Sequence, residues 1–130
     1  MTRWTRWMLV VLIGMLLVGC GGGQVNREAR AAAEQFTEAL AQGDLDAAKA
    51  MFGTPWDIRG FMTNRIRSHG EPQSATVESL TTGETTAQLV TVWELERATV
   101  QNVWSMSKQA DGWRITQPSM NPDDMVITPK

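Results

Sequence analysis

The feature that most constrains the fold is a change of hydrophobic period at Pro72. Before it, over residues 27–69, apolar side chains recur every three or four positions, as they do in amphipathic helices. After it, over residues 74–116, apolar and polar side chains alternate, as they do in half-buried strands. Helices segregated from strands predict an α+β domain. We therefore expect three N-terminal helices packed on an antiparallel sheet of about four strands.

Capping residues divide the helical part into three segments. Gly43 is suited to end the first helix, and Asp44 to cap the second. The third is predicted to begin with Thr54 as its N-cap and Pro55 at its first helical position, and to end at Gly70. The helices are expected over residues 27–42, 45–52 and 54–69.

Two turn sequences, "TTGE" and "QADG", separate the predicted strands. Along the longest strand, Leu89 and Trp93 share one face, and Val90 and Val92 share the other. Residues 118–130 hold three prolines and are predicted to be an extended, loosely held tail. The strands are expected over residues 74–80, 86–97, 99–108 and 113–116.

The N-terminus predicts export. "MTRWTRW" carries two arginines and no acid, and "MLVVLIGMLLVG" has no polar side chain, which together are typical of a secretory signal over residues 1–19. The sequence "LVGC" at its end resembles the lipobox of bacterial lipoproteins. This resemblance implies that the chain is cut before Cys20, and that the Cys20 thiol carries a diacylglycerol. Residues 20–25 would then be the lipidated cysteine and a flexible tether.

An uncleaved transmembrane helix is the alternative for this segment. Residues 7–23 just reach the length of about 17–25 residues that a span requires, but glycines crowd their end. Both interpretations place the rest of the chain outside the cytoplasm, attached to the cell membrane or the outer membrane.

Charge argues against a nucleic-acid-binding protein, and cysteine content rules out a disulfide within the chain. The formal net charge is −2, which gives no sign of the basic face that a nucleic-acid-binding protein uses to displace counterions. With a single cysteine, an intramolecular disulfide is ruled out.

The domain as a whole also resembles a known family. "AAEQFTEALAQGDLDAAKAMF" is similar to the opening helix pair of nuclear transport factor 2-like domains, and "TAQLVTV" and "SKQADGWRI" are similar to that fold's middle strand and closing hairpin. The resemblance covers residues 26–117. It implies a curved sheet wrapped around the helices, which forms a cone with a pocket at its open end.

Catalytic residues are hard to find in this pattern. The chain has no tyrosine, so a tyrosine-based oxyanion hole is ruled out. His69 is expected to lie at a helix end, where the dipole favours it, and Asp57 to act as a capping carboxylate rather than as a base. Glu94 and Glu96 share a strand face without a third ligand at a supporting spacing, so we expect a solvated face and no metal or cofactor.

The tryptophans are the unusual feature of the domain. Trp93, Trp104 and Trp113 are predicted on strand faces toward the helices, and Trp56 lies at the start of the predicted third helix. Each indole buries about 150–250 Å² when it belongs to a core. The alternative is an apolar ligand pocket in which their N–H groups orient a ligand.

These features predict a membrane-anchored envelope lipoprotein whose domain binds a small apolar ligand or an envelope protein without catalysis. One alternative is an isomerase-like or cyclase-like enzyme that uses a pocket carboxylate. Another is a structural accessory of an envelope complex, for which an exposed apolar patch around Val90 and Val92 would be the sign. Homodimerisation through the sheet is a further expectation.

Overall fold

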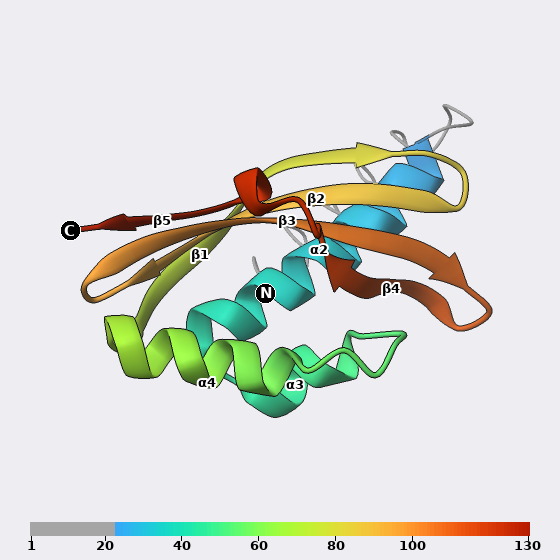
Figure 1. Cartoon of the computed structure of the whole chain (residues 1–130). Helices are drawn as coiled ribbons and strands as arrows, with labels where there is room; N and C mark the ends of the chain where they lie inside the picture. Colours follow the sequence, from blue (N-terminus) through green and yellow to red (C-terminus); the bar gives the residue numbers. More distant parts are fainter. Residues whose placement is uncertain (1–22) are drawn as a thin grey trace, which may run out of the picture.

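The computed structural model describes residues 23–130, and in Figure 1 three helices lie across one face of a curved antiparallel sheet. The predicted signal peptide and Cys20 lie outside the described residues. Within residues 23–130, no helix is long and apolar enough to cross a membrane. The elements in chain order are α2 (Gly23–Gln42), α3 (Leu45–Ala50), α4 (Ile58–His69), β1 (Pro72–Thr82), β2 (Thr86–Leu95), β3 (Ala98–Gln109), β4 (Gly112–Pro118), η2 (Pro122–Asp124) and β5 (Met125–Pro129).

Helix α2 packs on the sheet through the apolar stripe that its sequence predicts. The six apolar residues of this stripe are all buried, and Phe36 is fully enclosed. The helix begins at Gly23, so the last residues of the predicted flexible tether are helical. The buried stripe consists of Ala29, Ala32, Ala33, Phe36, Ala39 and Leu40.

The capping predictions are confirmed at three of four helix ends. Gly43 follows the last residue of α2 with a φ of 64°, and its N–H donates to the Leu40 carbonyl at 3.1 Å. Asp44 caps α3, where its Oδ1 accepts from the Ala47 N–H at 3.1 Å. Gly70 ends α4 with a φ of 94°, in the left-handed region that glycine adopts without strain. The prediction that Thr54 caps α4 is wrong, because Asp57 caps it by accepting from the Gly60 N–H at 2.9 Å.

The strands form one sheet in the order β1-β2-β3-β4, with β5 paired beside β3. The register places Trp93 opposite Val100 and Leu89 opposite Trp104. Alternate residues of β2 and β3 are buried, which confirms the predicted face of each strand. These buried positions face the helices and form the core with α2 and α4.

The C-terminal segment corrects the prediction of a loosely held tail. β4 pairs with only the second half of β3, from Trp104 onward, which leaves the backbone of its first half free for another strand. β5 takes that place and sets Ile127 opposite Val100, where it packs against the core. The sheet therefore has five strands rather than about four. Of the three prolines in this segment, Pro118 ends β4, Pro122 begins η2 and Pro129 ends β5.

Candidate functional site

The predicted pocket tryptophans divide into a core cluster and one groove residue. Trp93 and Trp104 are 1% and 0% exposed, and Trp56 is half-buried beside them. Trp104 meets Phe36 and Phe61 edge-on, with ring centroids 5.0 and 5.5 Å apart. Aromatic rings thus occupy the space between the helices and the sheet, where the resemblance placed a pocket.

Not every buried indole is satisfied. Trp104 Nε1 donates to Thr91 Oγ1 at 2.9 Å inside the core. The Nε1 atoms of Trp93 and Trp113 are buried without a hydrogen-bond partner, as is Nε of Arg65. Buried donors are nearly always paired in folded proteins, so each of these three is a place to look for a missing acceptor.

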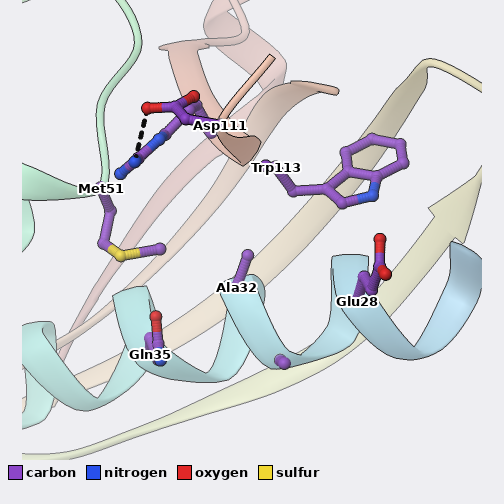
Figure 2. Close-up of a pocket in the computed structure, with 9 residues that line it drawn as sticks. Glu28, Ala32, Gln35, Met51, Asp111 and Trp113 are labelled. Atoms are coloured by element: carbon purple, nitrogen blue, oxygen red, sulfur yellow. Dashed lines mark hydrogen bonds and ion pairs between the residues drawn. The ribbon is translucent and has the colours of Figure 1, made fainter. Parts of the chain in front are cut away.

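Trp113 lies in the wall of a groove between α2 and the β3–β4 hairpin. Figure 2 shows this groove, whose volume is about 400 Å³. Glu28 and Gln35 line it from α2, and Met51 lines it from the end of α3. The indole of Trp113 lies above α2 with its nitrogen turned toward the helix and Glu28 (Figure 2). The lining is completed by Ala31, Ala32, Asp111, Gly112 and Arg114.

The groove continues along α2 into a second depression of about 640 Å³. Ala31, Gln35 and Met51 belong to both, so the two form one surface, which we call the α2 groove. Small side chains keep this surface hollow, because alanine at the exposed positions of α2 and α3 fills little space. The second part is lined further by Glu34, Glu38, Ala47 and Ala50.

Charge in the α2 groove is mostly acidic. Arg114 is its one lining cation, and it donates to Asp111 Oδ2 at 2.8 Å and to the Ala50 carbonyl at 2.8 Å. The hydrogen bond from Arg114 lowers the pKa of Asp111. Among the described residues, Glu28 and Gln35 make no hydrogen bond or ion pair, so both are available to a ligand.

None of the predicted acid–base candidates lines this groove. Asp57 is exposed and serves as the α4 cap, and His69 is half-buried at the end of that helix. Glu94 accepts from Lys130 Nζ at 2.9 Å and from the Thr99 hydroxyl, and these contacts lower its pKa. Glu96 accepts from the Glu71 N–H at 2.8 Å, so its side chain holds the connection between α4 and β1 against the end of β2.

Two further features bear on the alternatives. Across residues 26–130, every carboxylate is at least partly exposed, and no group of three or more potential ligands could hold a metal ion. Val90 and Val92, where an exposed apolar patch would have supported the structural-accessory alternative, are half-buried. The large apolar side chains that are exposed in the described part lie near the C-terminus instead: Met120, Met125 and Val126.

Sequence reasoning missed most of the α2 groove. It singled out Trp113 but predicted it inside the cone. The signal that could have found the groove is a second stripe on α2, formed by Glu28, Ala31 and Gln35 at spacings of three and four, next to the buried one. What the sequence does not show is that the β3–β4 hairpin lies against this stripe.

Two solved structures share this architecture over most of both chains. A nuclear transport factor 2-like protein of unknown function from Shewanella baltica OS155 has a TM-score of 0.60 and 11% identity, with 82% of this chain and 96% of that chain covered. Another from Silicibacter pomeroyi DSS-3 has a TM-score of 0.57 and 12% identity, with 85% and 100% covered. No family model matches the chain, and no curated protein matches it significantly. At such identities the likeness concerns the fold, and this chain has the nuclear transport factor 2-like fold that its sequence predicted.

Proposed function

We propose that this chain is a lipid-anchored envelope protein whose domain binds a segment of another envelope protein in the α2 groove, without catalysis. The observation that carries the proposal is the contrast between the two concave parts of the domain. Aromatic side chains fill the space under the sheet, whereas the α2 groove is open and has an apolar floor with unpaired polar groups at its edge.

The filled interior also bears on the choice of ligand. A small apolar ligand of the kind the sequence suggested would need room beside Trp93 and Trp104, and both are enclosed by their neighbours. A general acid or base with a raised pKa needs burial, and the carboxylates of the described residues lack it. These observations favour binding at the surface over binding or catalysis in the interior.

The anchor belongs to the same proposal. The "LVGC" sequence supports lipidation of Cys20, and Gly23, where α2 begins, follows it closely. A domain held in this way stays at the membrane surface, where a partner from the envelope is met in two dimensions rather than three.

Site-specific crosslinking in intact cells tests this function. A photo-crosslinking amino acid is placed at Gln35 in the groove, and in a second protein at Ser74, which is exposed on β1. We expect a discrete adduct from Gln35 alone, and its loss when Ala31→Arg fills the groove. Equal adducts from both positions, or an adduct that survives Ala31→Arg, would count against the α2 groove as the binding site.

A further inference from the structure

We propose that the segment bound in the α2 groove is a lysine- or arginine-bearing stretch of the partner chain. This inference rests on the proposed function and adds the chemistry of its partner. Four carboxylates line the groove, namely those of Glu28, Glu34, Glu38 and Asp111, against one guanidinium.

Pairing inside the protein leaves part of this negative charge uncompensated. Asp111 is satisfied by Arg114 at 2.8 Å. Glu34 faces Arg30 at 3.9 Å, and both side chains are more than half exposed, so that pair is weak. Glu38 accepts only a neutral hydrogen bond, from the Gln42 amide at 2.7 Å. Glu28 has no partner among the described residues.

The Trp113 indole adds an independent requirement. Trp113 is 4% exposed, and its indole N–H has no acceptor. The indole nitrogen is turned toward α2 and Glu28 at the edge of the groove (Figure 2). The site is one acceptor short, and a ligand at the Glu28 end of the groove supplies that acceptor when the side chains that cover the buried nitrogen move aside. A backbone carbonyl of a peptide can be that acceptor, and further along the groove the Gln35 amide can both donate to and accept from a peptide group.

The floor of the groove fits the remaining part of such a segment. Ala31, Ala50 and Met51 offer apolar surface between the acids, and a lysine or arginine lays its aliphatic stem on such surface while its charge reaches a carboxylate. From Glu28 to Glu38 the helix rises about 15 Å. An extended peptide advances about 3.3 Å per residue, so the groove accommodates roughly five residues.

Direct titration with labelled peptides tests the charge class. The full chain in detergent micelles is titrated with two capped pentapeptides, alternating alanine–lysine and alanine–glutamate, and binding is followed by anisotropy. We expect saturable binding of the lysine peptide at least tenfold tighter than that of the glutamate peptide. This binding should weaken as salt is raised, since exposed charges are screened.

Variants locate the binding. Glu28→Gln combined with Glu38→Gln should weaken the lysine peptide about threefold to tenfold, whereas Glu71→Gln, at the start of the sheet and away from the groove, should leave it unchanged. Trp113→Phe keeps most of the ring and removes the donor, and should weaken binding by a similar factor. The glutamine variants alter exposed side chains, so they remain informative if Trp113→Phe impairs folding.

Several results would overturn the inference. Equal affinity for the two peptides would do so, and so would an equal loss with Glu71→Gln. If neither peptide binds while crosslinking at Gln35 still yields its blockable adduct, the cationic class is wrong and the proposed function stands. If the adduct also fails to form, both are wrong.

Discussion

Replacing Thr91 by valine isolates one hydrogen bond in the aromatic core. Trp104 Nε1 donates to Thr91 Oγ1 at 2.9 Å, and the two residues are 0% and 1% exposed. Water therefore cannot take the place of the lost acceptor in Thr91→Val. Valine keeps the shape of threonine, so the change removes the acceptor with little change in packing.

The expected loss of unfolding free energy follows from the buried indole N–H that loses its acceptor. A buried N–H left without a partner costs about 1–3 kcal/mol, and the methyl group that replaces the hydroxyl offsets part of this through apolar burial. We expect Thr91→Val to lower the free energy of unfolding by about 1–2 kcal/mol. Trp104→Phe removes the donor instead and leaves a cavity among the rings. In the double variant no donor is orphaned, so its cost should fall short of the sum of the single costs by about 1 kcal/mol.

Urea unfolding followed by far-ultraviolet circular dichroism measures these differences without relying on tryptophan fluorescence. The control is Thr76→Val on the outer face of β1, where threonine is exposed and we expect a change within about 0.5 kcal/mol. The dependence of the free energy on urea should be the same in all variants. The reasoning would be refuted if Thr91→Val cost no more than Thr76→Val, or if the Thr91 and Trp104 effects simply added.

Three other outcomes are expected. Cys20→Ser should abolish incorporation of labelled palmitate and cleavage of the precursor, and undiminished labelling would disprove the anchor. Lys130→Met should raise the pKa of Glu94, measured by nuclear magnetic resonance, toward its ordinary value of 4.5, because the ammonium that lowers it is removed. Since that pKa is lowered in the folded chain, the stability contributed by the pair is present above about pH 4.5 and is lost as the pH falls below it. The variant should show a smaller acid-dependent loss, because the Thr99 hydrogen bond to Glu94 remains. Ile127→Ala should cost about 1–2 kcal/mol, because the half-buried side chain packs on the core, and a change near zero would indicate a loose tail.

The helices and the central strands were predictable because local sequence and tertiary packing agree there. On α2 and β2, the period of the apolar residues predicts the face that the structure buries, which includes Phe36 of α2 and Trp93 of β2. The helix cap was misplaced because Thr54 and Asp57 both suit an N-cap. The structure instead uses the Thr54 hydroxyl to donate to the Thr116 carbonyl of β4, a partner sixty-two positions away that local pattern cannot reveal.

β5 was missed for a different reason. Its sequence "MVIT" is rich in strand-forming residues, but prolines on both sides indicate a loop when they are considered locally. Proline is tolerated here because β5 is a short strand at the edge of the sheet, with its pairing on the β3 side. Whether a tail pairs depends on whether a strand elsewhere has free backbone, and that is a property of the assembled sheet.

Of the α2 groove, the sequence predicts which residue types are present but not how they are arranged. Trp113 could be recognised as unusual, but its unpaired N–H arises from the position of the hairpin against α2. Likewise Glu28 and Gln35 look like ordinary solvent-exposed helix residues in the sequence. Their significance comes from alanines at neighbouring positions, which leave space that larger side chains would have filled.

The proposed anchor and the α2 groove constrain each other. Gly23 is the third residue after Cys20, and three residue-to-residue steps span at most about 11 Å. Glu28 lies five residues further along α2, or about 7.5 Å. With Cys20 in the membrane surface, the Glu28 end of the groove therefore lies within about 20 Å of the lipid headgroups. A cationic segment that binds there must itself be close to the membrane, and anionic headgroups would compete with the groove carboxylates for it. Binding in vesicles should then weaken as the anionic lipid fraction rises, while binding in neutral detergent should not depend on the anchor.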